Sequence, residues 1–400
     1  MSSAPFYRRT TVLLGVVLLL GLALRLCYLS ELVHAPDFDY PLNDPQFKDY
    51  WARAMVSGDW TPPAGKREGF IDGYPYPNPP GYSLYLAAIY ALTDSSYLAP
   101  RIVQIALGLV NIVLVFVLGR ALFGRVTGLI AAFLMATYWS MIYYEGELNQ
   151  PVPFITLILC LMLVCHQWVL RPTPFHGLIA GLLLSAAALM RGEALSMGPV
   201  VFLWAAWAAW RMRRGRAFGV WAAGFVLGAA LLVSPVTIRN YRASGTFTPI
   251  AHTGEVSLMI GNSEGADGYS PVTPALRTLV PDGSWNVFNI PVMMETLAAR
   301  TGKERLTYQE WRDYFVSSAR AWIRENPGAF FRLVLKRAVL YWSPTEIDEN
   351  KVTTFEKEWS RTLRHLPGFP LPLTALALGL LRRRRDQRIL SYADPALRPW

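Results

Sequence analysis

The chain has 400 residues, of which 53% are hydrophobic and 16% carry a charge, and its net charge is +10. Soluble domains contain about 45–50% apolar and about 25% charged residues, so the composition excludes a disordered chain and an ordinary soluble enzyme of two or three domains. The apolar residues lie in separate blocks, and many arginines flank these blocks. This pattern is typical of an all-α polytopic membrane protein, in which basic residues set the orientation. It disfavours a nucleic-acid partner.

A helix that crosses a bilayer needs roughly 20 apolar residues. A shorter apolar stretch, 80–94, is expected to lie in the outer interface with its tyrosines at headgroup depth. The blocks predicted to span the membrane are, in chain order, 11–31, 98–119, 126–144, 151–169, 176–190, 194–210, 217–237 and the weaker 367–381.

Basic clusters decide the expected orientation, because cytoplasmic loops carry an excess of Lys and Arg. If seven helices run from residue 11 to residue 237, every cluster falls on the cytoplasmic side, together with both termini. The first block lacks a small-residue cleavage site before Glu31, so it is expected to remain as an uncleaved anchor. The clusters are Arg8-Arg9, Arg120 with Arg125, Arg171, Arg211 to Arg216, and Arg382 to Arg385.

Three parts of the chain follow from this topology. Residues 1–237 form a transmembrane module whose outer loop 32–97 contains interfacial helices. Residues 238–366 form a mixed outer-face domain, and residues 367–400 contain the last span and a basic tail. Within the outer domain, residues 245–290 predict loops with short strands, and residues 307–326 predict an amphipathic helix.

Ionisable residues collect at the expected outer ends of the spans, where they are costly to keep and are therefore functional candidates. Asp44 precedes an amphipathic helix and is either its cap or a general base. Asp49, within that helix, is expected to face water as a bystander. Glu145 and Glu147 share one short turn, and they bind a cation, hold a basic residue or are solvated.

Two arginines at outer helix ends suit a phosphate or pyrophosphate, because the planar guanidinium matches phosphate geometry. Arg191 lies between two spans, and Arg239 ends the seventh. Three polar residues that follow Arg239 are also candidates for substrate binding: Asn240, His252 and Asn262.

Several motifs together resemble the GT-C superfamily of membrane glycosyltransferases, which use polyprenyl-phosphate sugars. The most similar groups are bacterial relatives of the protein O-mannosyltransferases and of the aminoarabinose transferase that modifies lipid A. The resemblance covers roughly residues 10–346. Its motifs are Asp44 with Arg53, Met55 and Gly58-Asp59-Trp60; Pro79-Pro80-Gly81-Tyr82; Arg101 to Arg125; Ser234 to Tyr241 with Gly261-Asn262; and Ala319 to Pro327 with Lys336 to Glu346.

The resemblance implies a seven-helix GT-C-type module in a bacterial inner membrane. Its activity would be transfer of a sugar from a polyprenyl-phosphate carrier to a hydroxyl of a glycan, lipid or protein acceptor on the outer face. The donor, the acceptor and membrane lipids are thus the expected partners.

The resemblance also assigns residues. Asp44 corresponds to the proposed base of the family. Relatives carry a second acidic residue where this chain has Asn149 and Gln150, and Glu145 and Glu147 lie just before it. A divalent metal ion, if bound, would be held by Asp44 and Glu147. Asn78 and Tyr82, on either side of the Pro-Pro element, are further candidates for substrate binding, and some relatives have a phosphate-binding Lys at the position of Asn78.

The chemistry of glycosyl transfer agrees with these assignments. A carboxylate can take the acceptor proton, and arginines can stabilise the leaving phosphate. One base and one cationic leaving-group site suit inversion by single displacement. The chain has no Walker motif, so no nucleotide cofactor is expected. A transporter or flippase of lipid-linked sugars and a non-catalytic scaffold of the same fold are the alternatives.

Overall fold

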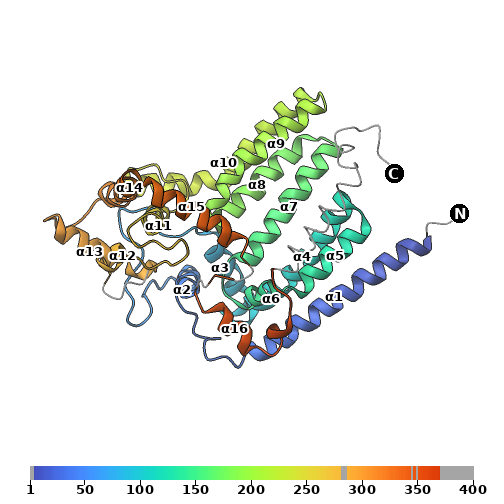
Figure 1. The fold of residues 1–400 in the computed structure, drawn as a ribbon, viewed down its shortest axis with the longest axis horizontal. Helices are drawn as coiled ribbons and strands as arrows, with labels where there is room; N and C mark the ends of the chain where they lie inside the picture. The colour runs from blue at the N-terminus through green and yellow to red at the C-terminus, as the bar shows by residue number, and fades with distance from the viewer. Residues whose placement is uncertain (1–3, 281–285, 344–345, 348–349, 370–400) are drawn as a thin grey trace.

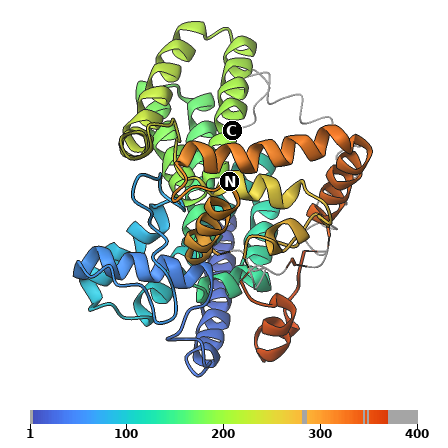
Figure 2. The same cartoon turned by 90° about the vertical axis from the view of Figure 1, so that its left-hand side faces the viewer.

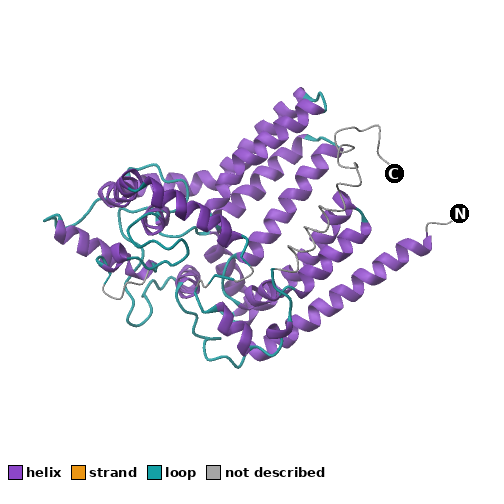
Figure 3. Cartoon of the chain, in the orientation of Figure 1, coloured by secondary structure: helices purple, strands orange, loops and turns teal. Residues whose placement is uncertain are grey.

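The computed structural model describes residues 4–280, 286–343, 346–347 and 350–369. Within these ranges the regular structure is helical and contains no strand, as Figure 3 shows. The expected all-α class is therefore confirmed. The short strands predicted over 245–290 are wrong for the described part of that segment. Thr273 and Asn286 of this segment instead cap short helices.

Each of the seven apolar blocks before residue 237 forms helix. The helices lie side by side as a bundle in Figure 1. Their bounds are α1 Ala4–Leu32, α4 Leu98–Phe123, α5 Arg125–Thr137, α6 Trp139–Gly146, α7 Pro151–Leu170, α8 Pro174–Met190, α9 Met197–Arg211 and α10 Gly215–Ser244.

By length and composition, α1, α4, α7 and α10 could each cross a bilayer. The expected span 126–144 is not one straight helix, because α5 and α6 meet at Tyr138 with a bend of 50°. The Thr137 hydroxyl donates to the Phe133 carbonyl four residues earlier, a bond that often bends helices. A 3-10 turn, η1 (Gly192–Ser196), precedes α9. The expected last span, 367–381, lies almost entirely outside the described residues.

Helices α8 and α10 make the closest helix contact, and glycines line it. A Cβ on Gly181 would lie 2.1 Å from the Phe225 carbonyl oxygen, and one on Gly228 would lie 2.2 Å from that of Leu178. Gly177 and Gly224 extend the same seam one turn earlier on each helix. Small residues four apart allow membrane helices to approach this closely.

The bundle has two unlike ends (Figure 1). The start of α1 and the short turns after α4, α7 and α9 lie at one end, and these turns carry the arginine-rich sequences. The segments 33–97 and 245–369 lie at the other end, which faces the viewer in Figure 2. The polar candidates of the turns after α6 and α8, of the start of α2 and of the end of α10 therefore lie at this second end.

The second end is built from shorter helices. Among them, α14 matches the predicted amphipathic helix, and a capping box between Thr307 and Glu310 begins it. Their bounds are α2 Asp44–Ser57, α3 Gly81–Thr93, α11 Thr253–Gly261, α12 Pro274–Arg277, η2 Val287–Asn289, α13 Ile290–Arg300, α14 Tyr308–Glu325, α15 Pro327–Tyr341, α16 Thr353–Trp359 and η3 Leu363–His365.

One hydrophobic core joins the early outer loop to the later segment. Phe47 and Trp51 of α2 pack with Phe288, Trp311 and Phe315 in a single buried cluster. The core anchors α2, so the first turn of this helix has a defined position.

Helix α3 differs in one respect from the expectation for 80–94. Tyr82 and Tyr90 are buried within the protein, so they are not available to headgroups. The exposed apolar residues of α3 are Leu84 and Leu92. The hydroxyls of Tyr82 and Tyr90 instead donate to Gln104 and Asp49 inside the protein.

Candidate active site

Asp44 is the first residue of α2, and Asn43, with a φ of 56°, is its N-cap. The side chain of Asp44 is 40% exposed. Its backbone N–H donates to Oδ1 of Asn350 over 3.2 Å. A carboxylate in the first turn of a helix is stabilised by the helix dipole. Asp44 is therefore fixed in position, accessible and not itself the cap.

Lys48 lies one turn further along α2 and is buried. Its Nζ donates to Oδ1 of Asn149 over 2.6 Å and to Oε1 of Gln150, and it lies 4.0 Å from Oδ2 of Asp44. Lys48 therefore connects Asp44 to the Asn149–Gln150 turn that precedes α7. The sequence analysis did not identify Lys48, although its i,i+4 spacing from Asp44 places both on one face of the helix.

Glu147 is occupied by a different lysine. Its Oε1 accepts from Nζ of Lys351 over 2.8 Å, and Lys351 also pairs with Asp37. Burial alone would lower the pKa of Lys351, but Glu147 and Asp37 together raise it. These groups and Arg101 line a small cavity beside Pro45 of α2.

Glu145 points away from this turn into the bundle. Oε2 and Oε1 of Glu145 lie 2.6 and 2.7 Å from Nε and Nη2 of Arg25, and both side chains are almost fully buried. Of the three roles considered for Glu145, the structure shows one: its carboxylate holds a basic residue, Arg25. Glu145 does not reach Asp44 through any contact among the described residues.

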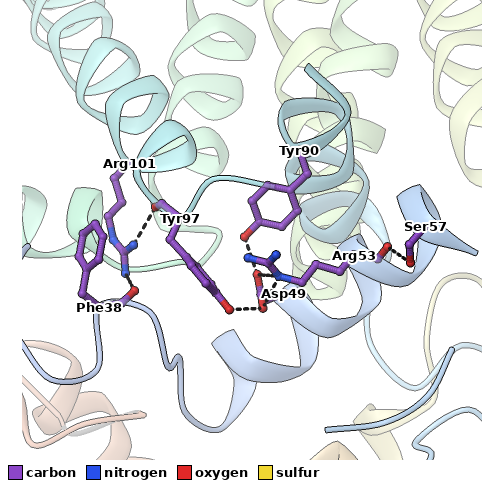
Figure 4. Close-up of polar contacts among 7 residues, drawn as sticks. All are labelled: Phe38, Asp49, Arg53, Ser57, Tyr90, Tyr97 and Arg101. Atoms are coloured by element: carbon purple, nitrogen blue, oxygen red, sulfur yellow. Dashed lines mark hydrogen bonds and ion pairs between the residues drawn. The ribbon is translucent and has the colours of Figure 1, made fainter. Parts of the chain in front are cut away.

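Asp49 does not face water, and that expectation is wrong. Its carboxylate accepts from Nε of Arg53 over 3.0 Å and from the hydroxyls of Tyr90 (2.5 Å) and Tyr97 (3.3 Å), as Figure 4 shows. Burial and the neighbouring Asp49 raise the pKa of Tyr97 to about 12. The partners of Asp49 are structural, and its bystander role in catalysis stays a prediction.

Arg101 forms a second fixed point in the same region. Its guanidinium donates to the carbonyls of Tyr97 and Phe38 and stacks over the Phe38 ring (Figure 4). It also donates to the Gly146 carbonyl. All three contacts are to backbone oxygen, so Arg101 ties the early loop to the turn after α6. This tie holds the end of α6 against the loop that precedes α2.

The two candidate phosphate-binding arginines differ in their surroundings. Arg239 donates to the Tyr74 carbonyl over 3.0 Å and stacks 4.1 Å from the centre of the Tyr76 ring. Arg191 is 41% exposed and lies 3.9 Å from Glu193. Both lie at the second end of the bundle.

The remaining candidates have structural contacts. Asn240 is buried, accepts from the Tyr76 N–H and donates to the Thr248 and Ile250 carbonyls. Asn262 donates to the carbonyl of Leu258. Asn78 is partly buried, and Tyr82 is buried with its hydroxyl donating to Gln104.

His252 is also placed away from Asp44. It is buried among the rings of Tyr74, Tyr308 and Trp311. Burial lowers its pKa to about 4, so the imidazole is neutral at pH 7 and belongs to the outer core. A catalytic or phosphate-binding role for His252 has no support in this geometry.

Residues 77–238 match the family described as dolichyl-phosphate-mannose-protein mannosyltransferase. This match covers less than half of the chain and agrees with the resemblance to the GT-C membrane glycosyltransferases. The segment that matches this mannosyltransferase family contains the Glu145–Gln150 turn and Arg191, whereas Asp44 and Lys48 precede it. No curated protein matches the chain.

Two solved structures are similar to the chain. One is the Archaeoglobus fulgidus oligosaccharyltransferase complex with Zn and sulfate, at 14% identity and a TM-score of 0.45, with 82% of this chain and 38% of that chain covered. The other is archaeal oligosaccharyltransferase AglB from the same organism with an inhibitory peptide and a dolichol-phosphate, at 15% identity and a TM-score of 0.47, with 100% and 40% covered. The chain thus spans about two fifths of their length.

Proposed function

We propose that the chain transfers a sugar from a polyprenyl-phosphate carrier to an acceptor hydroxyl at the second end of the bundle, and that this end faces the periplasm or outside of a bacterial inner membrane. The observation that carries the proposal is the position of Asp44. Its accessible carboxylate is fixed at the start of α2 and linked through Lys48 to the turn of the mannosyltransferase-family segment. The orientation rests on the arginine-rich turns at the opposite end.

The proposed reaction is a single displacement with inversion. Asp44 accepts the proton of the acceptor hydroxyl while the hydroxyl oxygen forms a bond to the anomeric carbon. The bond from that carbon to the carrier phosphate breaks, and the phosphate leaves with the bonding electron pair. Arg191 and Arg239 stabilise the charge that develops on the phosphate.

A divalent metal held by Asp44 and Glu147 does not fit these residues. Lys48 and Lys351 each place an ammonium against one of the two carboxylates. The described residues also contain no group of three or more His, Cys, Asp and Glu residues arranged to hold a metal. No step of the proposed reaction therefore passes through a metal.

Transfer can be tested in sealed membrane vesicles that contain the chain, with a panel of radiolabelled polyprenyl-phosphate hexoses and pentoses as donors. We expect label to reach an acceptor glycan, lipid or protein in vesicles whose outer leaflet is exposed, and not in inverted vesicles until they are permeabilised. Absence of transfer from every donor, with the chain folded, would contradict the proposal and favour a scaffold.

A second candidate is transport of a lipid-linked sugar. Broken helices and ionisable groups inside the bundle are features of transporters, and the break at Tyr138 and the Arg25–Glu145 pair are of this kind. Counterflow of labelled lipid-linked sugar in proteoliposomes without chemical transfer would support this function.

The Arg239→Lys variant is expected to lower transfer about 10- to 100-fold, because a lysine keeps the charge but cannot stack on Tyr76 and present a planar fork. Arg242→Lys, on the exposed last turn of the same helix, is the matched control and should retain activity. Steady-state transfer rates measure both. Full activity in the Arg191→Ala/Arg239→Ala double variant would contradict phosphate binding by these arginines.

A further inference from the structure

Lys48 occupies the centre of the proposed site, between the base and the turn that precedes α7. Its side chain is 8% exposed, and its ammonium lies among the amide oxygens of Asn149 and Gln150 and the carboxylate of Asp44. The ring of Tyr82 lies on another side, with its centre 5.9 Å from Nζ. The acceptors come from α2 and from a turn about a hundred residues later, so the ammonium joins two distant segments.

The oxygen atoms around the Lys48 ammonium form a cation-binding site. A lysine ammonium has three donors and no acceptor, and a buried charge is tolerated only when it is paired and hydrogen-bonded. Oxygen atoms from a carboxylate and from amide side chains are also the ligands that hard divalent cations take. The ligands that would hold a metal here therefore already surround a covalently attached cation.

The charge balance separates the two kinds of cation. The contacts described for Nζ set the ammonium against one carboxylate and two neutral amides, and a divalent ion brought to the same oxygens would be repelled by the ammonium.

We propose that the Lys48 ammonium is a built-in cation that takes the place of a divalent metal in this site. It is a positioning residue: it holds the Asp44 carboxylate against the Asn149–Gln150 turn, and the reaction proceeds without added metal. The proposal rests on the proposed glycosyl transfer for its activity readout, but its binding readout is independent of activity.

Metal binding is measured with Mn²⁺ by electron paramagnetic resonance on the detergent-solubilised full chain. Wild type is expected to bind no Mn²⁺ at this site. The Lys48→Ala/Asn149→Asp double variant removes the ammonium and adds a carboxylate, so it should bind about one Mn²⁺ per chain. Asn149→Asp alone is the matched control, because Lys48 would pair with the new carboxylate and exclude the metal. One Mn²⁺ bound by wild type and lost in Asp44→Asn would overturn the proposal.

The activity readout uses the same variants. Wild-type transfer should be unchanged by a chelator, and Lys48→Ala should lose about 10²-fold, as expected for loss of a charged positioning group. In the double variant, Mn²⁺ should restore part of the activity and the chelator should remove it again, which a merely structural role would not produce. Chelator-sensitive wild-type transfer would overturn the proposal. If wild type transfers no sugar, the proposed function fails while the Mn²⁺ measurement still decides the role of Lys48.

Discussion

Replacement of Asp44 by asparagine is expected to lower transfer about 10²- to 10⁴-fold while expression and folding stay near wild type. Asparagine preserves the size of the side chain but cannot accept the acceptor proton. The loss of charge in the first turn of α2 costs only about 0.3–1 kcal/mol of helix stabilisation. Initial rates of transfer, with thermal unfolding measured in parallel, separate the two effects.

Two variants of neighbouring acids serve as controls. Asp39→Asn changes an exposed residue of the same loop and should leave both transfer and stability unchanged. Asp49→Asn weakens the contacts to Arg53, Tyr90 and Tyr97, so we expect a loss of about 1–3 kcal/mol in stability. An active Asp44→Asn together with a folded but inactive Asp49→Asn would contradict the assignment of the base.

Removal of one partner of the Arg25–Glu145 pair is expected to be the most destabilising change in the bundle. Glu145→Gln leaves the Arg25 guanidinium buried without a counter-charge, which costs about 3–5 kcal/mol in comparable pairs. The Arg25→Met/Glu145→Leu double variant removes both charges and should recover most of the stability. Unfolding midpoints in detergent, compared with Glu193→Gln at an exposed site, provide the measurement.

The double variant also distinguishes a structural from a catalytic Glu145. If Glu145 only locks α1 against α6, the double variant should be stable and active. A stable but inactive double variant would show that the carboxylate itself takes part in the reaction. A Glu145→Gln variant as stable as wild type would contradict the pairing argument altogether.

The helices of the bundle could be predicted from the sequence because a bilayer-spanning block is a local property of about 20 residues. The bend at Tyr138 could not, since neither proline nor glycine stands there. It places α6 so that Glu145 meets Arg25, a partner 120 residues earlier in the chain.

Those parts of the candidate site that depend on local sequence could also be predicted. The motif around Asp44 is local, and its place at the start of a helix follows from the sequence. The burial of Asp49 depends on tyrosines 41 and 48 residues away. A lysine within a polar helix is normally solvated, so Lys48 stood out only when the Asn149–Gln150 turn lay against it.

The glycine seam between α8 and α10 also affects the C-terminal ends of these two helices. The contact aligns Gly181 with the turn around Gly228, and the two helices run on in the same direction. At 1.5 Å per residue, Arg191 lies about 15 Å beyond the first glycine and Arg239 about 17 Å beyond the second. The glycines deep in the bundle thus fix the register of the two helices and bring the backbone positions of Arg191 and Arg239 to nearly the same depth.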